Sequence, residues 1–143
     1  MSNVESTNTP SKSKGLELCE IRPLRSEDGP FVYATWLQGL YFGNRFYSRI
    51  PRHIFFDKYK AVISHFLIKG NIQVMCLKDD PDVILGYCCT HDNVLDWVFV
   101  KSAWRKLGIA GQLVPKDIKY YSHWTESTIT RIPKEWEFNP FLE

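Results

Sequence analysis

Residues 94–114 read VLDWVFVKSAWRKLGIAGQLV, an apolar run followed by a basic, glycine-containing turn and a helical segment. Residues 94–100 have the length and apolar character of a buried strand. A helix that begins after such a turn presents unpaired backbone N–H groups and the positive end of its dipole. Gly108 has no Cβ, and Ala110 and Gly111 are nearly as small, so a phosphate can approach this backbone closely. The stretch therefore predicts an anion-binding site for a phosphorylated cofactor.

Arg105, Gly108 and Ala110 form an Arg-x-x-Gly-x-Ala pattern that begins five residues after Val100. This pattern resembles the Arg/Gln-x-x-Gly-x-Gly/Ala acyl-CoA signature of the GNAT acyltransferase superfamily. A short glycine pattern is equally compatible with a basic surface beside an ordinary strand-to-helix turn. The order of elements along the chain favours the cofactor interpretation, because residues 21–28 resemble the superfamily's first strand and helix entry.

The resemblance also includes residues 83–87, which are similar to the central strand of the superfamily, and it covers residues 16 to about 125. Within the superfamily the chain looks most like small GNAT-like proteins encoded by bacteriophages. The shared features are the strand Asp96-Trp97-x-x-Val100-Lys101, the segment Ser122-His123-Trp124-Thr125 and the terminal Asn139-Pro140-Phe141-Leu142.

The resemblance implies an α/β fold with a central mixed sheet and helices on both faces. Residues 1–14 are polar apart from Val4 and the initiating Met1, so we expect a disordered tail there. The remaining residues, 15–143, are enough for a single domain with one packed core, since 44% of the chain is hydrophobic and 15% is aromatic.

The resemblance further implies that acetyl-CoA is the acyl donor. Backbone groups of Val98 and Val100 would bond the pantetheine arm where the fourth and fifth strands separate, and amides from residues 106–111 would hold the diphosphate with help from the Arg105 side chain. The expected cofactor-binding set is Val98, Phe99, Val100, Arg105, Lys106, Leu107, Gly108, Ile109, Ala110 and Gly111. Lys101, Lys106, Lys116 and Lys119 would add positive potential near the remaining phosphate.

Acyl transfer to an amine needs a group that accepts the proton of the amine. Asp96 lies nine residues before Arg105, where superfamily members often carry a carboxylate, usually the longer Glu. It is our candidate base, and the alternative is that it only binds backbone or a cationic substrate. The chain lacks the family's Asn-x-x-Ala-x-x-x-Tyr pattern, so Tyr121 and His123 are the candidate acids, although a lone His is also typical of a structural hydrogen bond.

The net charge, the cysteine spacing and the length of the apolar runs indicate which partners and which compartment to expect. The net charge of +2 and the pI near 8.3 are milder than the usual footprint of a nucleic-acid-binding domain. The four cysteines, Cys19, Cys76, Cys88 and Cys89, form no metal-binding or disulfide spacing, so we expect reduced thiols and no metal. Adjacent Cys88 and Cys89 should point to opposite faces of a strand. With no signal peptide and no apolar run near 18 residues, we expect a cytoplasmic protein.

Periodicity and turn residues predict the remaining elements. We expect strands at residues 16–21, 72–77, 83–90, 94–100 and 120–125, of which 72–100 form an antiparallel meander. A final strand, in which Trp136 and Phe138 alternate with glutamates, should finish at Asn139-Pro140. Helices are expected at residues 29–40, from Pro51 to about Lys69, after Gly108 until Pro115 or Lys119, and at 126–131.

The sequence leaves two classes of function open. The first is an enzyme that transfers an acyl group from acetyl-CoA to an amine of a small molecule, a protein or a nucleic acid. The second is a non-catalytic protein that keeps the fold and binds a partner, for example a viral effector. Arg45, Arg49, Arg52 and His53, interleaved with Phe46 and Tyr47, could contact a nucleic acid, or could form a solvated loop over tucked aromatic rings. The oligomeric state is also open.

Overall fold

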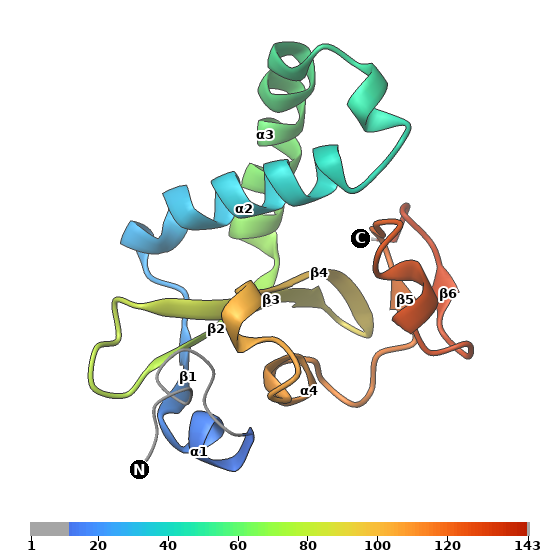
Figure 1. The fold of residues 1–143 in the computed structure, drawn as a ribbon. Helices are drawn as coiled ribbons and strands as arrows, with labels where there is room; N and C mark the ends of the chain where they lie inside the picture. Colours follow the sequence, from blue (N-terminus) through green and yellow to red (C-terminus); the bar gives the residue numbers. More distant parts are fainter. Residues whose placement is uncertain (1–11, 143) are drawn as a thin grey trace.

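The computed structural model describes residues 12–142, in which a six-stranded mixed sheet runs in the order β1 to β6 (Figure 1). The strands are β1 (Cys19–Pro23), β2 (Asn71–Leu77), β3 (Ile84–His91), β4 (Val94–Val100), β5 (Tyr120–Tyr121) and β6 (Glu137–Phe138). The first four strands are antiparallel, and β5 and β6 are added in parallel. The predicted mixed sheet and its central meander are confirmed.

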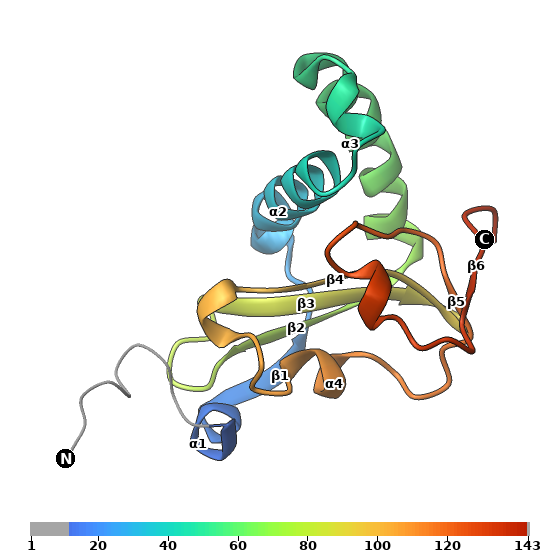
Figure 2. The same ribbon diagram turned by 45° about the vertical axis from the view of Figure 1, so that its right-hand side comes forward.

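Helices cover both faces of this sheet, as expected (Figure 2). The helices α2 (Gly29–Phe42) and α3 (Arg52–Lys69) pack on one face, where Trp36, Tyr87 and Trp97 belong to the larger core. The short helices α1 (Lys12–Glu17) and α4 (Ile109–Leu113) belong to the other face. None of the helices between residues 12 and 142 is long and apolar enough to cross a membrane.

Neighbouring cysteines confirm the expected alternation of the third strand. Cys88 packs in the smaller core with Met75 and Leu85, whereas Cys89 packs in the larger core on the opposite face. Both thiols are reduced, and burial raises the pKa of Cys88 to about 12. These side chains therefore fill the two cores as small apolar groups.

The first strand begins at Cys19, three residues later than the sequence predicts. Residues 12–17 form α1, and β1 begins at Cys19, opposite Leu77 at the end of β2. Because β2 ends there, the pairing stops after a last backbone bond of 2.9 Å from Lys78 N to the Leu18 carbonyl. Pro23 is tolerated in β1 because this strand lies at the edge of the sheet. Of the predicted disordered tail, residues 1–11 lie outside the described residues.

The C-terminal third has less regular structure than the sequence indicates. The predicted strand 120–125 is limited to Tyr120–Tyr121, and the predicted helix 126–131 is reduced to a 3₁₀ turn, η5 (Ile129–Arg131). Ser122 N still donates to the Leu95 carbonyl of β4 at 3.0 Å, and the chain then leaves the sheet, where Glu126 N donates to the carbonyl of Gly43 at 2.9 Å. The helix after Gly108 ends at Leu113, before Pro115.

Candidate functional site

The fourth strand, β4, contains a β-bulge at Asp96. Trp97 is opposite Cys89 and Leu95 is opposite Thr90, so Asp96 is an extra residue on β4. Such a bulge bends its strand and ends regular pairing. Consistent with this, β5 pairs with β4 only at Val94 and Leu95. The two strands separate beyond the bulge and leave an opening beside β4.

The outer edge of β4 offers backbone groups to this opening. Lys101 N donates to the Leu85 carbonyl at 2.8 Å, and hydrogen bonds alternate along an antiparallel pair. The backbone groups of Val98 and Val100 therefore point away from β3. Between residues 12 and 142, no strand pairs with this part of β4 on its outer side. The Val100 carbonyl accepts a hydrogen bond of 2.9 Å from Arg105 Nε, which positions the arginine at the opening.

The turn after β4 depends on one glycine. Gly108 has φ of 90°, a left-handed backbone that side chains rarely adopt, and Lys106 is also left-handed at 69°. Successive backbone N–H groups in such a turn can form a concave anion site. The helix that follows has five residues, so its dipole is weaker than that of the longer helix we expected.

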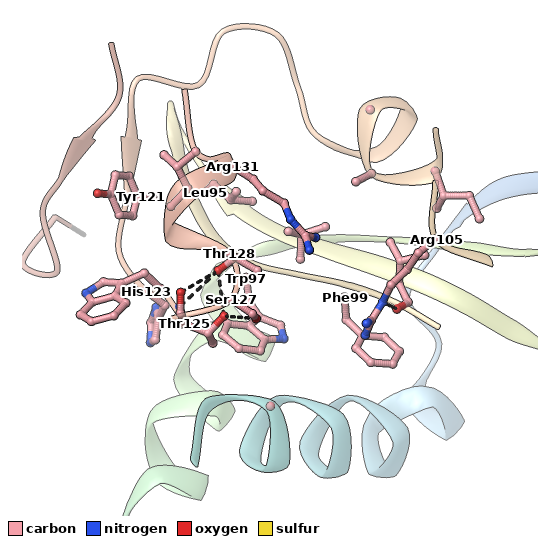
Figure 3. Close-up of a pocket in the computed structure, with 18 of the residues that line it drawn as sticks. Leu95, Trp97, Phe99, Arg105, Tyr121, His123, Thr125, Ser127, Thr128 and Arg131 are labelled. Atoms are coloured by element: carbon pink, nitrogen blue, oxygen red, sulfur yellow. Dashed lines mark hydrogen bonds between the residues drawn. The ribbon is translucent and has the colours of Figure 1, made fainter. Parts of the chain in front are cut away.

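A cleft of about 530 Å³ joins these features (Figure 3). It is lined by residues of β4, the turn, β5 and the segment 123–132, and Gly39 of α2 also borders it. The predicted site residues on its walls are Asp96, Val98, Phe99, Val100, Arg105, Lys106, Gly108, Ile109, Ala110, Gly111, Tyr121 and His123. Leu107 does not line the cleft, and its side chain is 4% exposed.

The wall opposite β4 carries polar residues that the sequence reasoning missed. Thr125 Oγ1 lies 2.8 Å from Thr128 Oγ1 and 3.3 Å from Ser127 Oγ, and Arg131 extends from the adjacent η5 (Figure 3). Segment 125–131 is rich in Ser and Thr and ends in Arg, although its local pattern predicts only a short helix. That composition is the signal that could have identified this wall.

Asp96 has a hydrogen-bond partner on each of its two oxygens within a continuous chain of hydrogen bonds. Its Oδ2 lies 2.7 Å from His91 Nδ1, and its Oδ1 accepts from Ser122 Oγ at 2.6 Å. Ser122 Oγ lies 2.9 Å from His123 Nδ1, and His123 Nε2 contacts the hydroxyl of Tyr59. Because the Ser122 proton is directed to Asp96, His123 must donate through Nδ1 and accept from Tyr59 at Nε2. Every donor in the chain points toward the carboxylate.

Burial sets the protonation of this chain. Asp96 is 1% exposed, and its burial raises the pKa of the carboxyl, while hydrogen bonds from Ser122 and His91 act in the opposite direction. His123 is surrounded by Trp36, Phe66 and other aromatic rings, and burial lowers its pKa to about 4. His123 is therefore neutral at physiological pH, with both ring nitrogens engaged.

Tyr121 borders the cleft in a different orientation from the one an acid requires. Its ring lies beside Phe138, with centroids 5.4 Å apart. Its hydroxyl points away from the space between Arg105 and Arg131 (Figure 3). The structure thus brings Asp96, Tyr121 and His123 to one cleft, but neither acid candidate presents a free polar atom to its centre.

No protein-family model matches this chain, and no curated protein matches its sequence. Several solved structures are similar to it over part of their length. A GCN5-related N-acetyltransferase from Rhodopseudomonas palustris shares 16% identity with a TM-score of 0.47, over 66% of this chain and 59% of that one. Apo YjaB from Escherichia coli shares 21% identity with a TM-score of 0.46, over 66% and 60%. YncA of Salmonella typhimurium, a putative acetyltransferase solved with its cofactor acetyl-CoA, shares 16% identity with a TM-score of 0.41, over 67% and 58%. The match spans about three fifths of each of these proteins.

Proposed function

We propose that this protein is an acyl-CoA-dependent N-acyltransferase that transfers an acyl group, acetyl in the simplest case, from CoA directly to an amine. The observation that carries the proposal is the unpaired outer edge of β4 beyond Asp96, which lies in one cleft with the turn 105–111. An extended ligand with amide groups can pair with such an edge as an added strand does. The pantetheine arm of CoA is an extended chain with two amides.

The turn supplies the second half of a CoA site. Arg105 and Lys106 place two cationic side chains at the cleft, beside the left-handed backbone at Lys106 and Gly108. Charged donors and backbone N–H groups together are suited to a diphosphate. In this arrangement the pantetheine amides bond Val98 and Val100, and the thioester lies near the bulge at Asp96.

In the chemical step, a neutral amine attacks the thioester carbonyl, the C–S bond breaks and the amine loses a proton. Asp96 is the proposed base, acting through one bridging water because its carboxylate is 1% exposed. Burial raises its pKa, which brings a carboxylate closer to the working range of a base. Ser122 and His91 are positioning residues that hold the carboxylate. The departing thiolate takes a proton from solvent.

A non-catalytic binding protein remains the second candidate. The orientation of the Tyr121 hydroxyl and the engagement of both nitrogens of His123 favour it, because neither candidate acid directs a free polar atom to the centre of the cleft. Alignment of a thioester with an amine can itself supply much of a rate enhancement, so transfer without an acid is chemically feasible.

Calorimetric titration with acetyl-CoA tests the site. Gly108→Trp would obstruct the turn but would also strain the left-handed backbone, so Gly111→Trp is the sharper variant. Gly111 lines the cleft and has room for a side chain, since no heavy atom lies within 4 Å of an added Cβ. Gln112→Trp is the matched control, being exposed on the same helix and outside the cleft lining.

We expect the wild-type protein and Gln112→Trp to bind acetyl-CoA equally and Gly111→Trp to lose binding. Thiol release with a panel of amines then separates the enzyme from the binding protein. Failure of the wild-type protein to bind acetyl-CoA would overturn the proposed function.

A further inference from the structure

A second cavity, of about 240 Å³, lies beside the cleft, and both include His123 and Trp124 in their walls. Aromatic rings dominate its lining: Tyr47, Tyr59, Phe66, Trp124 and Phe138. No Lys, Arg, Asp or Glu side chain of residues 15–142 lines it. Burying an ionised group there would be costly, whereas a neutral planar group fits such walls.

The surface next to this cavity is cationic. Residues 41–54, here called the α2–α3 tip, join the end of α2 to the start of α3 and project from the sheet (Figure 1). The tip carries Arg45, Arg49, Arg52 and His53, all exposed. No Asp or Glu occurs between residues 29 and 56. The charge is therefore concentrated locally, although the whole chain has a net charge of only +2.

The tip also exposes aromatic rings that are connected to the cavity. Phe42 is 59% exposed and Phe46 is 66% exposed, and the guanidinium of Arg52 lies 5.2 Å from the centre of the Phe42 ring. The Phe46 ring lies edge-on to Trp124, with centroids 6.1 Å apart. Asn44 Oδ1 accepts from Phe46 N at 3.1 Å, and Asn44 itself lines the cavity. An exposed stacking surface thus borders the aromatic cavity.

We propose that the α2–α3 tip and the second cavity bind single-stranded nucleic acid. One base enters the aromatic cavity, a neighbouring base stacks on Phe46, and the phosphates pair with Arg45 and Arg49. This combination of stacking rings and cations is the usual means of holding a single strand, whereas the bases of a duplex are already stacked and paired. An anionic membrane would match the cations but has no neutral planar group for the cavity.

One carboxylate lies beside the proposed surface. Glu126 Oε2 is 3.5 Å from Arg45 Nε, but the Arg45 side chain is 87% exposed. An exposed pair of this kind contributes little, so a phosphate can replace the carboxylate. The proposal does not depend on acyl transfer, because it concerns a different cavity, which shares only His123 and Trp124 with the cleft.

Fluorescence anisotropy of labelled oligothymidylate and oligouridylate, each eight nucleotides long, tests binding to the full chain. Comparison of the two distinguishes a DNA ligand from an RNA ligand. We expect a Kd on the order of 10⁻⁶ to 10⁻⁴ M for at least one of them at physiological salt. The pair Arg45→Ala/Arg49→Ala should weaken binding and reduce the dependence of log Kd on log salt by about 1.4. Phe46→Ala should weaken binding about tenfold.

The matched control is Lys116→Ala/Lys119→Ala, which removes two exposed cations outside the tip and should leave the affinity unchanged. The proposal is overturned if the wild-type protein binds neither oligonucleotide at 50 mM salt, about the low end of the range in which phosphate contacts are strongest. It is also overturned if the lysine pair, and not the arginine pair, carries binding, since this result would place the oligonucleotide away from the tip. Competition by acetyl-CoA would overturn it as well, since this result would place the oligonucleotide in the cleft. Sedimentation with anionic phospholipid vesicles tests a membrane as the ligand. Binding to vesicles without binding to oligonucleotides would overturn the proposal. Because acetyl-CoA binding is measured separately, either proposal can fail alone.

Discussion

Ser122 Oγ donates a hydrogen bond of 2.6 Å to Oδ1 of Asp96, joining the first residue after β5 to the bulge of β4. This contact lies where the two strands cease to pair, so it ties the end of β5 to Asp96 on the wall of the cleft. It also supplies one of the two donors that hold a buried carboxylate. The same serine therefore bears on both the shape of the cleft and the acidity of the proposed base.

Ser122→Ala should raise the pKa of Asp96. The variant removes a hydrogen bond that lowers this pKa, while burial, which raises it, is unchanged. A hydrogen bond to a charged group contributes about 1.5–3 kcal/mol, which corresponds to about one to two pH units. The rising limb of the pH–rate profile should therefore move to higher pH. A ¹³C titration of the Asp96 carboxyl provides the same measurement without an acceptor substrate.

Ser127→Ala is the matched control for this prediction, because Ser127 borders the cleft and contacts Thr125 rather than Asp96. An unchanged titration of Asp96 in the Ser122 variant would contradict the proposed positioning role.

His123 should make the protein lose stability as the pH falls below neutrality. Burial lowers its pKa from 6.5 to about 4, so between these values the unfolded chain binds a proton that the folded protein does not. Its contribution to the free energy of unfolding is full above pH 6.5 and falls by about 1.4 kcal/mol per pH unit below it. The decline from this group ends near pH 4.

Urea unfolding at a series of pH values measures this decline. His123→Gln should remove most of the slope between pH 6.5 and 4, and His53→Gln, at an exposed position, should retain it. A His123 that titrates near 6.5 by NMR would show that the ring is not neutral and buried as described.

The sequence predicts regular elements well where both ends of a strand or helix carry local signals. The strand 94–100 and the helix after Pro51 are examples, since apolar periodicity and turn residues bound both. The short β5 was not predictable in this way, because its end depends on contacts far away in the chain. Ser122 turns toward Asp96, and Glu126 bonds to Gly43. Local propensity contains no information on such contacts.

In the candidate site, too, the sequence predicts the features with local signals and misses those that depend on distant contacts. The motif from Arg105 to Ala110 indicates a turn for an anion, and these residues, apart from buried Leu107, do line the cleft. The bulge at Asp96 and the partnership with His91 depend on strand register, which one sequence does not reveal. Whether the cofactor-binding set holds acetyl-CoA stays a prediction.

Asp28→Asn should strongly destabilise the fold. Asp28 accepts two hydrogen bonds from the guanidinium of Arg22, at 2.7 and 3.0 Å, and both side chains are buried. Removing one charge leaves Arg22 uncompensated, at a cost of about 3–5 kcal/mol. Asp82→Asn is the control, because the pair Arg25–Asp82 is exposed and should change stability by less than about 1 kcal/mol. Thermal unfolding compares the two, and equal effects would contradict the prediction.

The pKa of Asp28 makes the stability contributed by the Arg22–Asp28 pair depend on pH. Burial raises the pKa of Asp28, but hydrogen bonds from Arg22 and from Arg25 N outweigh this effect and the pKa is lowered. A lowered carboxyl pKa contributes stability above the unfolded value near 3.8, and the contribution is lost as the pH falls through the folded value. Asp28→Asn should flatten the stability profile in this acidic window and leave the His123 decline at higher pH intact.

Two glycine substitutions should act in opposite directions. At Gly86 of β3, an added Cβ would lie 2.6 Å from the carbonyl oxygen of Phe99 on β4, so backbone atoms must move. Gly86→Ala should therefore lower the free energy of unfolding by about 1–3 kcal/mol.

At Gly111, an added Cβ meets no heavy atom within 4 Å, and Ala is a better helix former by about 1 kcal/mol. Gly111→Ala should therefore stabilise α4 without disturbing β4. Chemical denaturation measures both, and a neutral Gly86→Ala would show that β3 and β4 can separate at this point without cost.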